Sequence, residues 1–139
     1  MIVLDTNVLS EVLRPIPDAK VRRWLERQAG AAMFTTAICE AEILYGIALM
    51  PAGRRRRALE QAAAAIFQED FAGRILPFDR AAAREFAGIA AGRLAAGRRI
   101  GDFDAQIAAI ARSRGAVVAT RNVADFSDCG IDVIDPWKA

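Results

Sequence analysis

The stretch that decides the fold is Ile-Val-Leu-Asp-Thr-Asn-Val-Leu-Ser, residues 2–10. Its first three residues form an unbroken apolar run that ends at Asp5, which is typical of a short buried strand in a parallel sheet. After the acid, apolar residues recur at helical spacing until Pro15, which stops a helix. The stretch therefore predicts a strand-to-helix turn with a carboxylate at the carboxyl end of the strand.

The rest of the chain repeats this alternation of strand-like and helical segments. Alternation of this kind favours an α/β/α three-layer domain with a mainly parallel central sheet. The length of 139 residues predicts a single domain, residues 1–139. Pro77 lies in one predicted strand and indicates a sheet edge. The predicted strands cover residues 2–4, 32–35, 75–78, 117–119 and 131–134, and the predicted helices cover residues 8–13, 18–25, 37–50, 54–70, 79–96 and 102–114.

The composition excludes several classes of chemistry. Histidine is absent, so the chain cannot form a Ser-His-Asp or Cys-His arrangement or a histidine-ligated zinc site. Its two cysteines, Cys39 and Cys129, lie too far apart in the sequence to resemble a zinc motif or a disulfide framework. No apolar run approaches the roughly 20 residues that span a bilayer, and the start lacks a basic leader. We therefore expect a cytoplasmic protein with no membrane partner.

Two acids occupy positions where a carboxylate is unusual. Asp5 directly follows an apolar strand, so it is expected to be nearly buried, where an unpaired charge is costly. Its ordinary alternative role is the N-cap of the next helix. Glu42 shares a helix face with Ile38, Tyr45 and Leu49, and no basic residue lies one turn away. Its ordinary alternative is a half-exposed glutamate whose methylenes cover that apolar stripe.

The same angular argument separates two acids near residue 103. Asp104 shares its stripe with Ile107 on the core-facing side, whereas Asp102 fits the N-cap position of the helix. Asp104 is therefore the candidate for chemistry, although both acids would also suit a first helical turn. Asn122 and Asp125 follow the strand at residues 117–119 and are further candidates at a strand end.

These side chains come from four separate segments of the chain. In a parallel α/β sheet such positions can meet beyond the carboxyl ends of the strands. Several carboxylates in one pocket repel each other and need a cation to stay ionised together. Ligands that are all oxygen suit Mg²⁺ or Mn²⁺, and a metal-activated water suits hydrolysis of phosphodiesters. The sequence thus predicts an acidic metal site with nuclease chemistry.

Five stretches carry a resemblance to a known family. They are IVLDTNVLS (2–10), TAICEAEILYG (36–46), IGDFDAQIAA (100–109), VATRNVADF (118–126) and DPW (135–137). With these stretches in this order, the chain resembles the PIN-domain ribonucleases, and specifically the VapC/FitB-like toxins of type II toxin–antitoxin pairs. The resemblance extends over almost the whole chain.

The resemblance implies RNA cleavage that depends on Mg²⁺ or Mn²⁺. It implies that Asp5, Glu42 and Asp104 are catalytic acids, with Asp125 as a fourth, and that Asp5, Asp104 and Asn122 hold the metal. Some family members carry an aspartate where this chain has Asn122, so either Asn122 or Asp125 fills the fourth position. It also implies a small cognate antitoxin as partner, and a homodimer or a hetero-oligomer with that antitoxin.

Other residues are expected to act around these acids. Thr6, Asn7 and Thr120 are candidates for supporting the acids or contacting substrate phosphates. Arg54–Arg57 and Arg98–Arg99 are candidates for holding flanking RNA phosphates, although basic runs are more often solvated helix faces. We also hypothesise that an arginine of the antitoxin inserts among the carboxylates and replaces the cation.

Four other functions could be built on a domain of this kind. A response-regulator receiver domain needs a lysine after its last core strand, and neither Lys20 nor Lys138 fits. A haloacid-dehalogenase-type phosphatase needs Asp-x-Asp after the first strand, where this chain has Asn7. A PIN-fold binding module without catalysis and a PIN-fold nuclease of RNA maturation remain as alternatives.

Overall fold

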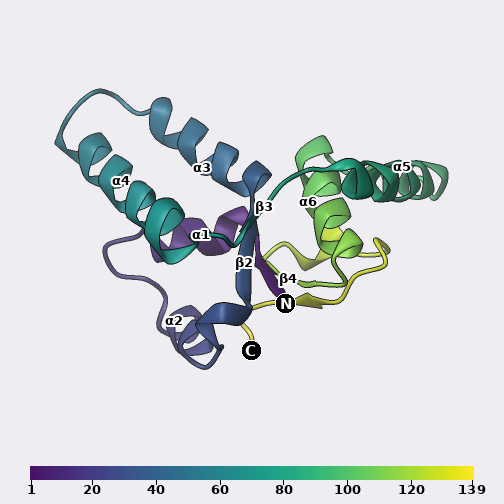
Figure 1. The fold of residues 1–139 in the computed structure, drawn as a ribbon, viewed down its shortest axis with the longest axis horizontal. Coiled ribbons are helices and arrows are strands. Elements are labelled where there is room, and N and C mark those ends of the chain that lie inside the picture. Colours follow the sequence, from purple (N-terminus) through teal and green to yellow (C-terminus); the bar gives the residue numbers. More distant parts are fainter.

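Five parallel strands form one sheet in the computed structural model, which describes residues 1–139 (Figure 1). The strand order is β3-β2-β1-β4-β5, so the first strand lies at the centre. The predicted parallel α/β sheet is confirmed. The strands are β1 (Ile2–Leu4), β2 (Met33–Thr36), β3 (Ile75–Leu76), β4 (Val117–Ala119) and β5 (Val133–Ile134).

Helices cover the sheet from both sides and complete the predicted three-layer α/β/α fold. In Figure 1, α1, α3 and α4 gather on one side of the central strands, and α5 and α6 on the other. The α-helices are α1 (Thr6–Val12), α2 (Ala19–Glu26), α3 (Ala37–Ala48), α4 (Arg54–Ala65), α5 (Arg80–Ala95) and α6 (Asp102–Ser113). Shorter helical turns are η1 (Gly30–Ala32), η2 (Ile66–Asp70), which is a π-turn continuing α4, and η3 (Val123–Phe126).

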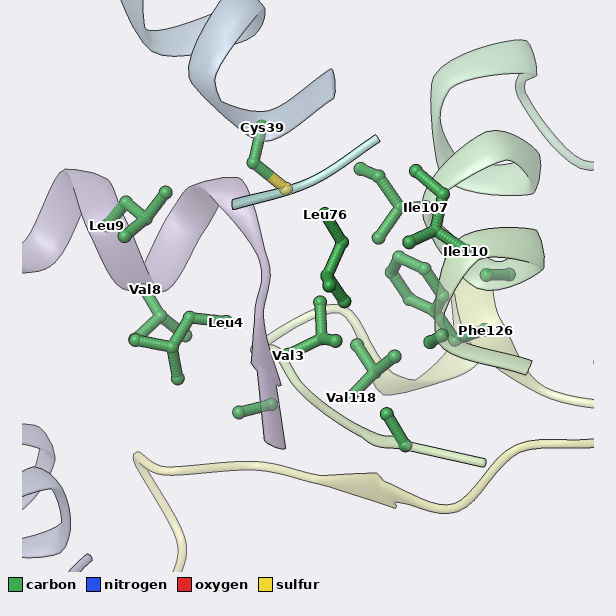
Figure 2. Close-up of a cluster of buried hydrophobic side chains, with 14 of the residues drawn as sticks. Val3, Leu4, Val8, Leu9, Cys39, Leu76, Ile107, Ile110, Val118 and Phe126 are labelled. Atoms are coloured by element: carbon green, nitrogen blue, oxygen red, sulfur yellow. The ribbon is translucent and has the colours of Figure 1, made fainter. Parts of the chain in front are cut away.

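The central strand sends alternate side chains to the two halves of the core. In Figure 2, Leu4 lies with Val8 of α1, while Val3 lies with Val118 on the side of α6. Alternation of this kind follows from the two-residue period of a strand. Helix α6 contributes six buried residues, so its position relative to β1 is fixed by packing. Each buried aliphatic side chain contributes about 1.5–3 kcal/mol.

Local signals set most element boundaries as expected. β3 ends at Leu76 on the sheet edge, directly before Pro77, and the Thr36 hydroxyl caps α3 by accepting the Cys39 N–H at 3.0 Å. The expectation that Asp102 caps α6 is wrong. The N-cap is Gly101, and Asp102 is the first helical residue with no capping hydrogen bond, because the helix begins at the acid itself.

Both cysteines are free and buried. None of the helices combines the length and the apolar composition that crossing a bilayer requires.

Candidate functional site

Asp5 stands at the carboxyl end of the central strand and is 4% exposed. Its Oδ1 accepts the Thr6 N–H at 2.8 Å, and its Oδ2 accepts the Thr120 hydroxyl at 2.7 Å. The first bond makes Asp5 the N-cap of α1. Asp5 is therefore nearly buried, as expected, and it is also the N-cap of α1, while its side chain lines a cavity.

A small polar network holds this carboxylate from behind. The Thr120 side chain is fully buried, and its hydroxyl also accepts the Asn7 amide and the Asn122 N–H, each at 3.0 Å. The Asn7 carbonyl oxygen in turn accepts the Arg121 N–H at 3.2 Å. Thr120 and Asn7 thus tie the loop after β4 to the start of α1. Thr120 supports Asp5 and, being buried, does not reach the cavity surface.

Glu42 lies on α3 and is half-buried. The expected inward apolar stripe around it is wrong, because Tyr45 and Leu49 are 66% and 67% exposed, and α3 packs on the core through other residues such as Ile43. Glu42 gains its partner from α1, since the Thr6 hydroxyl donates to Oε1 at 2.8 Å. The acid therefore faces the start of α1, beside Asp5.

Asp104 enters from the other side of the sheet. It lies in the first turn of α6, one turn before the fully buried Ile107 and Ala108, as the stripe argument predicted. A cavity of about 470 Å³ brings this residue together with Asp5 and Glu42. The cavity is lined by Asp5, Thr6, Asn7, Ser10, Glu11, Arg14, Glu42, Asp104, Arg121, Asn122 and Trp137.

The two candidates after β4 have different positions. Asn122 lines the cavity, whereas Asp125 is exposed and lies outside the cavity wall. The Asp125 charge still reaches the site, because it raises the pKa of both Asp5 and Asp104. The cavity wall therefore carries four carboxylates and the amides of Asn7 and Asn122. One of the four, Glu11, is paired with Arg14 at 3.2 Å, so Asp5, Glu42 and Asp104 are the carboxylates without a cationic partner.

The electrostatics of the cavity disfavour its negative charges. Burial raises the pKa of Asp104 to about 6, and the charges of Asp5, Asp125 and Glu42 add to the rise. Burial also raises the pKa of Asp5 and of Glu42, against the hydrogen bonds from Thr120 and Thr6. Asp5 contributes to the raised pKa of both other acids, so the three carboxylates act as one repelling group.

The donor set fits a hard divalent cation. All of the lining donors that could bind an ion are oxygens, as Mg²⁺ and Mn²⁺ prefer. A cation would also relieve the repulsion that raises the three pKa values. No three acidic or thiol side chains lie close enough together to form a finished metal cluster. The side chains therefore have the oxygen atoms that a metal site needs, but the acids are not close enough together to coordinate one ion.

Arg93 is a supporting residue that the sequence did not single out. Its side chain is 7% exposed, and Nε donates to the Arg98 carbonyl at 2.7 Å. Nη1 donates to the carbonyls of Asp125 and Ser127 at 3.0 and 2.9 Å. One buried guanidinium thus joins the approach to α6 with the η3 loop. An arginine in the last turn of a helix is an ordinary sequence feature, so no signal in the sequence marks this role.

The arginine runs do not line the acidic cavity. The Arg98 side chain bonds to Asp128 and to the Ser127 hydroxyl, and Arg56 pairs with Glu60 at 2.8 Å. The start of α4, which carries Arg54–Arg57, lies at the far end of the α3–α4 pair, away from the sheet (Figure 1). The basic side chains on the cavity wall are instead Arg14 and Arg121.

Comparison with known proteins gives one family. The PIN domain family model matches residues 2–130. The chain is 41% identical over 138 residues to "VapC ribonuclease Y4jK" of Sinorhizobium fredii, covering 99% of each chain. It is 38% identical over 137 residues to "Toxin FitB" of Neisseria gonorrhoeae, again covering 99% of each.

Solved structures agree with these relatives. A structure of FitAB bound to a DNA fragment contains a chain that superposes with a TM-score of 0.92 at 38% identity, covering 99% of this chain and 96% of that one. A structure of DNA-bound VapBC from Salmonella typhimurium gives a TM-score of 0.81 at 28% identity, with 97% of both chains covered. The similarity therefore extends over essentially the full length of the compared chains.

Proposed function

The chain belongs to the PIN-domain family, and from that premise we propose that it is a metal-dependent ribonuclease and the toxin of a toxin–antitoxin pair. One observation carries the proposal: carboxylates from the start of α1, from α3 and from α6 line one cavity, where the charge of Asp5 raises the pKa of the other two. Relatives of nearly equal length that are named as ribonucleases and toxins support the substrate class and the biological role.

We propose that Asp5, Asp104 and Asn122 hold Mg²⁺ or Mn²⁺, which when bound supplies an activated water and offsets phosphate charge. Thr120 fixes the Asp5 carboxylate through its 2.7 Å bond to Oδ2, and the Thr6 N–H holds Oδ1 at 2.8 Å. Glu42, held by Thr6, is the acid placed to orient a water or accept its proton. Because histidine is absent, no imidazole can share this task.

The proposed partner is a small antitoxin. Structures of related toxins are described as FitAB and VapBC complexes, some of them bound to DNA. A cationic side chain from such a partner would offset the same repulsion as a metal ion does. Binding should then weaken when Asp5 and Asp104 are both made neutral. Equal binding by that double variant would argue against insertion of an arginine among the carboxylates. We also propose that the toxin dimerises, alone or within the complex.

The test is RNA hydrolysis by the purified protein. Total RNA is incubated with Mg²⁺, with Mn²⁺ or with a chelator, beside the variants Asp5→Asn and Asp102→Asn. We expect cleavage with either metal and none with chelator. The cleavage rate of Asp5→Asn should fall at least about 100-fold, because losing a direct metal ligand should cost at least as much as losing a residue that hydrogen-bonds to a ligand. Asp102→Asn is the matched control, because Asp102 is exposed and outside the cavity. Normal turnover by Asp5→Asn would refute the catalytic assignment.

The amide at Asn122 favours one alternative, a PIN-fold binding module without catalysis. An amide supplies an oxygen ligand but no negative charge, so the cavity wall has one charge fewer than an all-carboxylate site. Metal binding in calorimetry with no RNA turnover would support this alternative. Cleavage that the cognate antitoxin does not suppress would instead favour a nuclease of RNA maturation.

A further inference from the structure

A second hollow, of about 620 Å³, adjoins the acidic cavity. Its walls come from the start of α2, from the loop after β4 and from the C-terminal segment, and they carry Lys20, Arg23, Arg121, Trp137 and Lys138. The four basic side chains are exposed, and none of them forms an ion pair. The hollow thus concentrates free positive charge around one aromatic ring.

Two acids also line this hollow, and the Oδ1 atom of each accepts backbone N–H groups. Asp18 accepts the N–H groups of Lys20 and Val21 at 2.8 and 3.2 Å as the N-cap of α2. Asp135 accepts the Trp137 N–H at 2.9 Å. Four cations against two carboxylates leave the lining with an excess of two positive charges, which favours an external anion.

The hollow lies next to the acidic cavity, because Arg121 and Trp137 line both. The Arg121 guanidinium carbon lies 5.1 Å from the centre of the Trp137 ring, in a cation–π contact. The backbone N–H of Arg121 donates to the Asn7 side-chain oxygen, and the Asn7 side-chain nitrogen donates to Asp5 Oδ2 at 3.4 Å. The shared wall is therefore fixed relative to the proposed catalytic carboxylate.

We propose that this basic hollow binds the single-stranded RNA segment that flanks the cleaved bond. Lys20 and Arg23 hold phosphates of that segment, and the Arg121–Trp137 pair offers planar surface for a base. Free cations beside an aromatic ring are the combination with which single-stranded nucleic acids are held without sequence reading. The inference rests on the proposed ribonuclease function, and it assigns the flanking contacts to this hollow and not to the arginine runs.

Binding is measured in the Asp5→Asn protein, so that RNA is not consumed. A fluorescently labelled single-stranded RNA oligonucleotide is titrated at several salt concentrations with Mg²⁺ present. In this background, Lys20→Glu/Arg23→Glu is compared with Arg54→Glu/Arg57→Glu, which reverses two exposed charges at the far end of the α3–α4 pair. Lys20→Gln/Arg23→Gln is a milder second variant if charge reversal disturbs α2.

We expect the Lys20/Arg23 variant to weaken RNA binding at least about tenfold. The slope of log affinity against log salt should fall by about 1.4, because each lost contact with single-stranded phosphate removes about 0.7. The control variant should keep both values. Unchanged affinity and slope in the Lys20/Arg23 variants would overturn the proposal. So would an equal loss in the control, or a loss of antitoxin binding with RNA binding intact, which would assign the hollow to the protein partner.

Cleavage kinetics separate this inference from the proposed function. With Asp5 restored, Lys20→Glu/Arg23→Glu should raise KM for long RNA with little change in kcat, and leave cleavage of oligonucleotides too short to reach the hollow unaffected. Trp137→Ala should raise KM for long RNA, whereas Trp137→Phe, which keeps an aromatic ring, should have a KM close to that of wild type. If the protein cleaves RNA and these substitutions leave that cleavage unchanged, RNA binding at the hollow is refuted and the ribonuclease function stands. RNA binding at the hollow with no wild-type cleavage refutes the nuclease function alone.

Discussion

Neutralising Asp104 should stabilise the metal-free protein at neutral pH. The pKa of this carboxyl is raised from 3.8 to about 6 by burial and by the neighbouring acids. A carboxyl that binds its proton more tightly in the folded state than in the unfolded state opposes folding when it is ionised. This penalty is complete above about pH 6, shrinks as pH falls through 6, and vanishes below 3.8, where both states are protonated.

The size of the effect follows from the same shift. A rise of about two pKa units corresponds to about 3 kcal/mol at 1.4 kcal/mol per unit. Because Asp104 is only half-buried and its cavity opens to solvent, screening reduces this to about 1–2 kcal/mol. For a chain of 139 residues that gain corresponds to a rise in Tm of about 3–6 °C.

The assay is thermal unfolding of Asp104→Asn and wild type in chelator, at pH 7.5 and again near pH 4.5. We expect the variant to unfold at the higher temperature at pH 7.5 and the difference between the two proteins to narrow near pH 4.5. Mg²⁺ should stabilise wild type more than the variant. Asp102→Asn is the control and should lie within about 0.5 kcal/mol of wild type, as an exposed substitution. A variant no more stable than wild type, or a gain independent of pH, would refute the reasoning.

Three further predictions concern the residues around the acids. Thr120→Val removes the hydroxyl that donates to Asp5, so we expect a loss of about 1–3 kcal/mol in unfolding free energy and about 10–100-fold in metal affinity, with Thr120→Ser restoring most of both in denaturant titration and calorimetry. Arg93→Ala leaves three backbone carbonyls without their donor, so it should lower the free energy of unfolding in urea by about 3–5 kcal/mol. Unchanged stability would mean that the η3 loop keeps its position without Arg93. Asn122→Ala should reduce RNA cleavage more than Asp125→Ala, because only Asn122 lines the cavity, and the reverse order in initial rates would make Asp125 the fourth ligand.

The spacing of apolar residues correctly predicted two elements whose buried faces show in residues close together in the sequence. The apolar run before Asp5 identified the central strand, and the stripe from Asp104 to Ile107 identified the inward face of α6. Both segments pack within the core, so the apolar residues on them do mark a buried face. On α3 the same argument failed, because Tyr45 and Leu49 form an exposed apolar stripe that looks identical in sequence to a buried one.

The supporting contacts could not be read from the sequence because they join distant segments. Thr120 and Asp5 are separated by 115 positions, and Arg93 reaches carbonyls 32 and 34 residues further along. A threonine after a strand and an arginine at a helix end are common, so neither residue type carries a signal. The cap of α6 was misassigned for a different reason: Gly101 and Asp102 are both acceptable caps, and only the backbone decides which residue is helical.

The raised pKa values of the acids imply how the fold and the function are linked. Carboxylates that repel each other destabilise the fold, and the core must offset that cost before any ligand binds. Each ligand that brings positive charge, whether a divalent cation or an arginine of a partner, gains the free energy stored in this repulsion. The two ligands would then compete for the same carboxylates. An antitoxin that acts in this way would inhibit cleavage by removing the metal's site, and its affinity should fall as Mg²⁺ rises.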